Sequence, residues 1–327
     1  MRATMSLFRR EFFAYFTGPI GYVALFSFLM LNGLLFFLVV GLLTERGPQG
    51  VEYPMQVMLG GADNPEWALV AGVLFWGLFP AVTGIITSRL IAEERGTGTL
   101  EALLTAPIRD WQVVFAKFAA CFAFYVLMWA ATLIYVPVLA DLHAQWKLVV
   151  TPFSIALAAG LVLILLAKLG FWFDANGWLV LILGLLGAAA AGAGGYLHYT
   201  RDAEHVLTPT AGIDPMPVLT SYLGVLLAGA MFLSLGLLVS SWVKSQLVAW
   251  MLSLLLGLCF VLPAALRWQF DTGSAVDPFV YYVSVPEHFR RDFTRGVIDT
   301  RPLVLYASVT LCCLFLTVRS LEARRLR

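Results

Sequence analysis

The residues of this sequence that could do chemistry are gathered in a few short charged segments. The most charged of them is Arg89–Trp111, RLIAEERGTGTLEALLTAPIRDW, which contains seven charged residues, two glycines and one proline. The neighbouring tracts 67–88 and 118–140 contain no Asp, Glu, Lys or Arg. Ion pairs and hydrogen bonds to a partner are the chemistry that such a segment offers.

Motifs of catalysis and nucleotide binding are missing from the chain. There is no H-E-x-x-H, no G-x-S-x-G and no G-x-x-x-x-G-K-[ST]. His143, His198, His205 and His288 fall in predicted outer loops, and the spacing of HYTRDAEH matches no helical pair of metal ligands. We therefore expect solvated loop histidines, no metal site, no catalytic residue and no cofactor bound by this chain.

The elements that must position the charged segments are membrane spans. Hydrophobic residues make up 60% of the 327 residues and charged ones 13%, about half the usual share of a soluble domain. A bilayer core is crossed by roughly 20 apolar residues in a helix. Eight tracts qualify and predict an all-α polytopic membrane protein: 19–43, 68–88, 113–140, 150–168, 177–197, 217–241, 246–266 and 302–319.

The predicted spans carry no ionisable residue near their centres. A charge at the middle of a span is expensive, so it is kept mainly for function. Its absence argues against proton- or sodium-coupled transport through carboxylate relays, although coupling through backbone carbonyls stays open.

The charged segment Arg89–Trp111 has the pattern of a helix, a break and a second helix. The second span can continue to Gly96, which tolerates the left-handed conformation at a helix end. Thr97 or Thr99 can cap a short helix that ends before Pro107, and Asp110 is a plausible N-cap of the third span. The short helix is too small to be stable alone, so we expect it to dock on a partner.

Two further segments have amphipathic character. Residues 1–18 place apolar side chains against Arg9, Arg10 and Glu11 and predict an interfacial helix that turns into the membrane at Gly18-Pro19. In the outer loop 267–301, Ser284 and Glu287 resemble a capping box, and Gly296 could end a short amphipathic helix on the outer leaflet. The residues assigned to these helices are Phe8, Arg9, Arg10, Phe12 and Phe16 in the first, and Glu287, Phe289, Phe293 and Arg295 in the second.

The distribution of charge predicts the orientation. With both termini in the cytoplasm, the inner segments hold 13 Lys and Arg against 7 acids, and the outer segments hold 8 against 13. The positive-inside rule favours this arrangement, which places 89–112 in the cytoplasm.

These segments resemble the ABC-2 type permeases of ATP-driven exporters, in particular the gliding-motility-type bacterial branch. The resemblance is carried by 7–37, 89–118 and 222–253, and by 293–325; the E-E-R-x-x-G-T-L-E pattern followed by Pro107-Ile108 is its most specific part. It implies a six-span core in the bacterial inner membrane, dimerisation with a second permease chain, and a separate ATPase subunit that binds ATP.

The resemblance also implies that 89–112 is a cytoplasmic coupling loop that sits in a groove of the ATPase. Its contact candidates are Glu93, Glu94, Arg95, Gly96, Thr97, Thr99, Leu100, Glu101, Leu104 and Pro107. Segment 141–213 departs from the family pattern, because it adds an inserted helix pair within what is otherwise a single transmembrane domain, 1–327.

The leading hypothesis is therefore an exporter permease without enzymatic activity of its own. Uncharged, aromatic-rich spans favour a lipid-like or amphipathic cargo, and contacts with membrane lipid but not nucleic acid are expected. A nucleotide-independent membrane scaffold of a surface or motility complex is the alternative, and a membrane enzyme is disfavoured by the missing motifs.

Overall fold

The computed structural model describes residues 2–46, 59, 75–99, 108–133, 215–266 and 277–325. All of them belong to one compact unit, made of Met1–Leu133 together with Asp214–Arg327. The second unit, Ile134–Ile213, contains none of the described residues. The predicted inserted pair at 141–213 therefore lies outside the described part of the chain.

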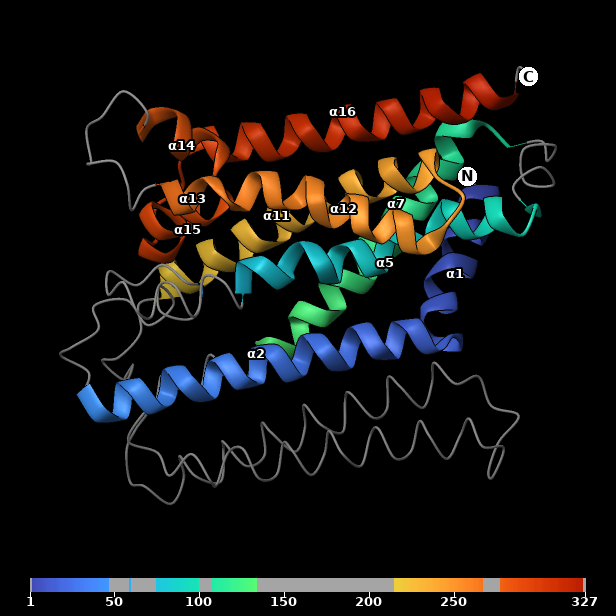
Figure 1. The fold of residues 1–327 in the computed structure, drawn as a ribbon. Helices are drawn as coiled ribbons and strands as arrows, with labels where there is room; N and C mark the ends of the chain where they lie inside the picture. Colours follow the sequence, from blue (N-terminus) through green and yellow to red (C-terminus); the bar gives the residue numbers. More distant parts are fainter. Residues whose placement is uncertain are drawn as a thin grey trace, which may run out of the picture. The chain divides into compact units, whose positions relative to one another are not determined.

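Every regular element in the described ranges is a helix, as the sequence predicted (Figure 1). The first part of the chain forms α1 (Arg2–Thr17), α2 (Pro19–Arg46), α5 (Gly77–Gly96) and α7 (Asp110–Thr132). The second part forms α11 (Pro215–Trp242), α12 (Gln246–Val261), α13 (Pro263–Leu266), α14 (Asp277–Val283), α15 (Val285–Arg291), the 3-10 helix η3 (Phe293–Arg295) and α16 (Thr300–Arg325).

Four helices of the described residues are long and apolar enough to cross a membrane: 110–132, 216–242, 246–265 and 300–324. The predicted extension of the second span is also present, because α5 runs without a break to Gly96. The apolar tract that precedes α5 lies mostly outside the described residues, so the number of spans stays a prediction.

The N-terminal segment is a helix of its own, as predicted. α1 ends at Thr17, and α2 starts at Pro19, where the fixed φ of proline suits a first helical position. Figure 1 shows α1 turned away from the axis of α2. Figure 1 also places both termini and the Gly96 end of α5 at the same end of this unit.

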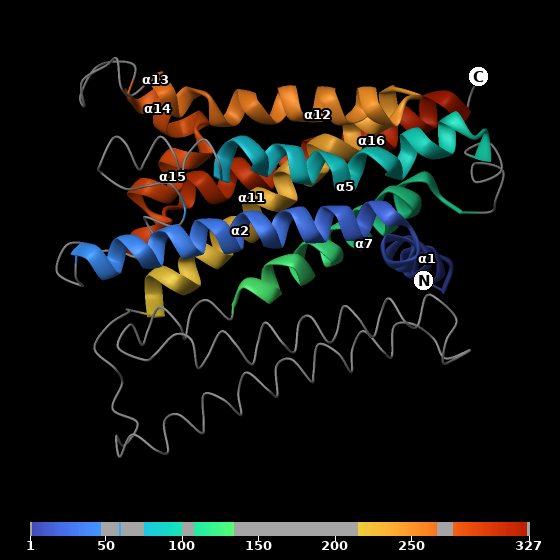
Figure 2. The same ribbon diagram turned by 60° about the horizontal axis from the view of Figure 1, so that its bottom comes forward.

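The core of the unit is built around α11, which packs against α5, α7, α12 and α16 (Figure 2). Glycines allow these helices to approach closely. A Cβ atom added to Gly229 would lie 2.2 Å from the Tyr125 ring of α7, and one added to Gly236 would lie 2.0 Å from Thr87 Oγ1 of α5. Polar bonds supplement the packing: the indole of Trp250 on α12 donates to Ala81 O at 3.0 Å.

The predicted outer loop contains α14, α15 and η3 rather than one amphipathic helix. Phe289 and Phe293 are fully buried, and Thr220 of α11 donates a hydrogen bond to Phe293 O. Gly296 ends η3 with a φ of 82°, so the predicted C-cap is confirmed. Since Glu287 is buried as well while Arg295 is exposed, this segment packs against the helical bundle and does not simply lie on a lipid surface.

Two sequence-based expectations for this loop are wrong. Ser284 occupies the N-cap position of α15, but its hydroxyl makes no hydrogen bond with the described residues, so the capping box does not form. His288 is not solvated: it is 1% exposed, and its Nδ1 lies 2.8 Å from the Tyr306 hydroxyl of α16. The sequence shows the i, i+4 spacing that places Phe289 and Phe293 on one buried face. Which neighbouring side chains are buried with them depends on how this segment packs against α11 and α16.

The burial of His288 predicts acid sensitivity. Desolvation lowers the pKa of His288 to about 4, although the charges of Glu287 and Asp299 act in the opposite direction. The ordinary histidine pKa is about 6.5, so between roughly pH 6.5 and pH 4 the unfolded chain binds a proton that the folded chain does not. The contribution of neutral His288 to the free energy of unfolding should therefore be fully present above that pH range and be lost as the pH falls through it.

We expect a loss of about 2 kcal/mol in the free energy of unfolding at pH 5 relative to pH 7.5. The measurement is unfolding of the purified chain by SDS in mixed micelles at both pH values, with His288→Gln as the comparison. Equal pH dependence in wild type and variant would show that another group is responsible.

Candidate functional site

The start of the charged segment Arg89–Trp111 is the C-terminal end of α5. Glu93 is exposed there, whereas the next residue, Glu94, has a side chain that is 18% exposed and turns toward α7. Thr97 caps the helix: its N–H and its hydroxyl both reach Glu93 O, each at 2.9 Å, and the hydroxyl lies 3.0 Å from that of Thr99. This segment thus leaves the bundle through a well-defined helix end.

Three details of the predicted coupling loop either differ from the sequence-based expectation or fall on residues that the structure does not describe. Gly98, and not Gly96, has the positive φ, 75°. Asp110 is the first residue of α7, and Arg109 occupies the N-cap position, where its N–H donates to Gln112 Oε1 at 3.2 Å. The candidates Leu100, Glu101, Leu104 and Pro107 lie outside the described residues.

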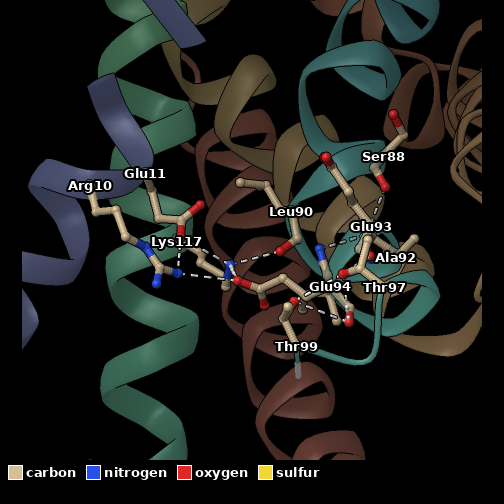
Figure 3. A network of polar contacts seen from close by, with 12 residues as sticks. Arg10, Glu11, Ser88, Leu90, Ala92, Glu93, Glu94, Thr97, Thr99 and Lys117 are labelled. Carbon is tan, nitrogen blue, oxygen red and sulfur yellow. Dashed lines mark hydrogen bonds and ion pairs between the residues drawn. The ribbon is translucent and has the colours of Figure 1, made fainter. Parts of the chain in front are cut away.

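Lys117 of α7 is the centre of a polar cluster that joins three helices (Figure 3). Its side chain is 1% exposed, and Nζ donates to Leu90 O of α5 at 2.7 Å. The same Nζ lies 2.8 Å from Glu94 Oε1 and 3.3 Å from Glu11 Oε1 of α1. Three acceptors match the three donors of an ammonium group. One lysine therefore holds α1 and the end of α5 against α7.

Arg10 completes this four-residue cluster, which we call the Lys117 cluster: Arg10, Glu11, Glu94 and Lys117. Arg10 Nη2 lies 2.7 Å from Glu11 Oε1 and 3.2 Å from Glu94 Oε1, and its side chain is 60% exposed. The two cations and two carboxylates of the cluster cancel in net charge. Burial acts to raise the pKa of Glu11, but the charges of Lys117 and Arg10 outweigh it, and the pKa is lowered overall.

The end of α5 is also attached to α11. Arg95 Nη1 donates to Ser241 O at 3.0 Å and to Val243 O at 2.9 Å, at the C-terminal end of α11 where carbonyls lack helical partners. The Ser240 hydroxyl accepts from Ile91 N and Ala92 N and lies 3.1 Å from Ser88 O, to which it donates. Arg95, expected to contact a partner, is thus used within the chain.

Helix α1 is tied to the same region by aromatic contacts. Tyr15 is 1% exposed, stacks on Phe124 of α7 at a centroid distance of 4.6 Å, and donates to Ile86 O of α5 at 2.9 Å. Arg89 lies 4.5 Å above the Tyr15 ring. Phe12 packs against Phe8 and Phe16 along α1, at 6.0 and 5.4 Å, while Arg9 and Arg10 are exposed.

Sequence reasoning missed Lys117, Glu11, Tyr15 and Ser240 as members of this site. A signal existed for Lys117, because a lysine that starts an otherwise uncharged span needs a partner to be buried. The other three carry no comparable signal. Their roles depend on contacts between residues 71 to 152 positions apart, such as Tyr15 with Ile86 and Ser240 with Ser88.

The arrangement is suited to transmitting force between helices. In the described ranges no three His, Cys, Asp or Glu side chains come together as metal ligands. What the site does provide is a helix end that is bonded to α1, α7 and α11 at once. A displacement of the loop after Gly96 would reach all of them.

Comparison with protein-family models places part of this chain in a known family. A family model described as "ABC-2 family transporter protein" matches residues 19–191, slightly more than half of the chain. The matched range begins at the first residue of α2 and includes α5, the charged segment Arg89–Trp111 and α7. No curated protein sequence matches the chain.

Proposed function

Because this chain belongs to the ABC-2 family of transporter proteins, we propose that it is the membrane-spanning permease subunit of an ATP-driven exporter. A separate ATPase subunit binds and hydrolyses ATP, and this chain supplies the path. Two permease chains associate in the bacterial inner membrane, with both termini in the cytoplasm. Both termini and the C-terminal end of α5 lie at the same end of the unit (Figure 1), and this supports an orientation in which all three face the cytoplasm.

The observation that carries the proposal is the attachment of the α5 end to three other helices. A loop that docks in a groove of an ATPase transmits movement only if its base is fixed to the elements that must move. Here Glu94 and Lys117 connect the base to α1 and α7, and Arg95 connects it to α11. ATP-driven closure of the ATPase pair would then shift these helices together and alternate the access of the path between protomers.

The neighbouring residues Glu93 and Glu94 make different contacts, and this difference indicates which of them a partner would bind. Glu93 is exposed and has no ion pair among the described residues, whereas Glu94 is engaged inside the chain. Glu93 is therefore the acidic side chain at the α5 end that is available to a basic residue of the ATPase. Glu101, which lies outside the described residues, is the second candidate on the sequence alone. Cargo is proposed to be lipid-like or amphipathic, in keeping with the apolar spans.

We expect Glu93→Arg to weaken the association with the ATPase at least tenfold, because charge reversal at a rim contact replaces attraction by repulsion. The measurement is affinity purification of the tagged chain in mild detergent, with the co-purified P-loop ATPase quantified. Glu101→Arg should behave alike. Glu322→Arg is the matched control, since Glu322 on α16 is also acidic but pairs with Arg319 at 2.9 Å.

A chain that purifies without any ATPase, under conditions that keep a known ABC complex together, would contradict the exporter proposal and favour the scaffold hypothesis. Co-purification that is insensitive to Glu93→Arg and Glu101→Arg would leave the ATPase partner in place. It would move the contact away from these two acids.

A further inference from the structure

Helix α1 packs against the bundle through one face. The residues of that face are Leu7, Glu11 and Tyr15, which follow one another at intervals of four and are buried. Glu11 pairs with Lys117 of α7, and Tyr15 stacks on Phe124 of the same helix. Successive residues of an α-helix point about 100° apart, so a row of residues shifted by two positions lies on the opposite face. That row forms the outer face of α1.

The outer face of α1 combines a cation with apolar side chains. Its row consists of Met5, Arg9 and Phe13. Met5 is 65% exposed, Arg9 is exposed, and Phe13 is half-buried. The Arg9 guanidinium lies 5.9 Å from the centroid of the Phe13 ring, so the charge is held beside an aromatic side chain. Half-buried Phe12 and Phe16 flank the row. This mixture is typical of a helix that lies between lipid and water.

Arg89 of α5 adds a second cation at the corner where α1 meets α2. Its guanidinium lies 4.5 Å from the centroid of the Tyr15 ring. A Cβ atom added to Gly18 would lie 3.4 Å from Arg89 Nη1. Gly18 separates the end of α1 at Thr17 from the start of α2 at Pro19, so this arginine lies beside the turn between the two helices.

The charges at this corner do not cancel. The Lys117 cluster is neutral, with two cations and two carboxylates. Arg9 and Arg89, by contrast, form no ion pair with the residues that the structure describes, and Glu93, one turn from Arg89 on α5, does not pair with it. An excess of positive charge therefore remains around α1, and it favours an anionic neighbour.

Helix α2 fixes the depth of this corner. It contains 28 residues and has no charged residue before Glu45. Its length of about 42 Å exceeds the roughly 30 Å of a bilayer core. When α2 spans the membrane as the sequence predicts, its first residue lies at the level of the lipid headgroups. The turn beside Arg89 and the outer face of α1 lie at that level too.

We propose that the outer face of α1 and Arg89 bind anionic phospholipids in the leaflet at the N-terminal end of α2. Met5 and Phe13 contact the upper part of the acyl chains, and Arg9 and Arg89 contact phosphate oxygens, for which a guanidinium has matching donors. A headgroup with net negative charge is preferred to a zwitterionic one, because each basic residue near the surface adds to the attraction. The proposal goes beyond the proposed function and does not depend on an ATPase.

The test compares two lipids that share their acyl chains and differ in headgroup charge: dioctanoyl phosphatidylglycerol and dioctanoyl phosphatidylcholine. Each is titrated into the purified full chain in a nonionic detergent at about 50 mM salt, and the apparent Kd is obtained from the rise in melting temperature. We expect phosphatidylglycerol to bind about 25-fold more tightly, roughly fivefold for each arginine. About 0.5 M salt should remove most of this preference, because exposed charges are then screened.

Arg9→Gln and Arg89→Gln should each lower the ratio of the two Kd values to about fivefold, and the double variant should bind both lipids equally. Arg319→Gln is the matched control. It changes the net charge by the same amount, but Arg319 already pairs with Glu322 at 2.9 Å, so the ratio should not change. Arg89→Lys keeps the positive charge and should retain most of the preference, which separates the effect of charge from that of the contact with Tyr15.

Equal binding of the two lipids by the wild type at low salt would overturn the proposal, and so would a preference that survives in the double variant. Loss of a co-purified ATPase in these variants, with the lipid preference intact, would assign the face to that partner instead. If Arg89→Gln fails to fold, the exposed Arg9→Gln still decides. A chain that purifies without an ATPase yet prefers phosphatidylglycerol would contradict the proposed function and support this proposal.

Discussion

Lys117→Met should lower the free energy of unfolding by about 3–5 kcal/mol at neutral pH, because it removes the central cation and leaves Glu11 and Glu94 with Arg10 alone. Arg10 is 60% exposed and cannot replace a cation that is 1% exposed. The measurement is SDS-induced unfolding of the purified chain in mixed micelles. In the proposed complex with an ATPase, we expect basal ATP hydrolysis to persist and the proposed transport to be lost.

The effect of pH distinguishes this cluster from ordinary packing. In the wild type the pKa of Glu11 is lowered. Its contribution to the free energy of unfolding is therefore present above about pH 4.3 and disappears as the pH falls through the folded-state pKa. Without Lys117, burial and the neighbouring Glu94 should raise that pKa. Stability should then be lost as the pH rises through it. The difference in the free energy of unfolding between Lys117→Met and the wild type should accordingly be smaller at pH 5 than at pH 7.5. The effect of His288 is the same in both proteins, so it does not change this difference.

Two controls accompany Lys117→Met. The triple variant Lys117→Met, Glu11→Gln, Glu94→Gln removes the uncompensated charges and should recover much of the lost stability, as replacement of a whole buried ionic group often does. Arg10→Gln should change stability by at most about 1 kcal/mol, because Arg10 forms exposed ion pairs. A Lys117→Met chain as stable as Arg10→Gln would show that the cluster contributes little.

Gly236→Ala should destabilise the bundle by about 1–3 kcal/mol, the usual range for overpacking. The added Cβ would lie 2.0 Å from Thr87 Oγ1 and 3.0 Å from Thr87 Cβ, so α5 and α11 must separate. The hydroxyl cannot easily turn away, because it hydrogen-bonds to Thr83 O at 3.0 Å and to Gly84 O at 3.3 Å. Separation here should also weaken the contacts of Arg95 and Ser240 with their partner helices.

The matched control for Gly236→Ala is Gly77→Ala on α5, where an added Cβ meets nothing within 4 Å. That change should be neutral or stabilising by up to about 1 kcal/mol, since alanine is the better helix former. Adding Thr87→Ala to Gly236→Ala removes the nearest atom and should restore part of the loss. If both glycine variants unfold at the same SDS fraction, the close approach of α5 and α11 is not limiting.

Several features of this protein could be predicted from the sequence because they depend on residues that are close along the chain. Hydropathy averaged over about 20 residues is enough to indicate a span, and Gly18-Pro19 is enough to indicate where α1 ends and α2 begins. The extension of α5 to Gly96 and the cap at Gly296 follow from the same local rules. The family resemblance was carried by such segments too.

The tertiary structure alone decided how these helices are rotated about their axes. Glu93 and Glu94 are chemically identical, and successive helical residues point about 100° apart, so the sequence does not tell which of them turns toward α7. Burial of Lys117 and His288 needed partners on other helices, Glu11 and Leu90 for the first and Tyr306 for the second. Local patterns specify which elements form, whereas the pairing of charges and donors depends on packing between segments far apart in the sequence.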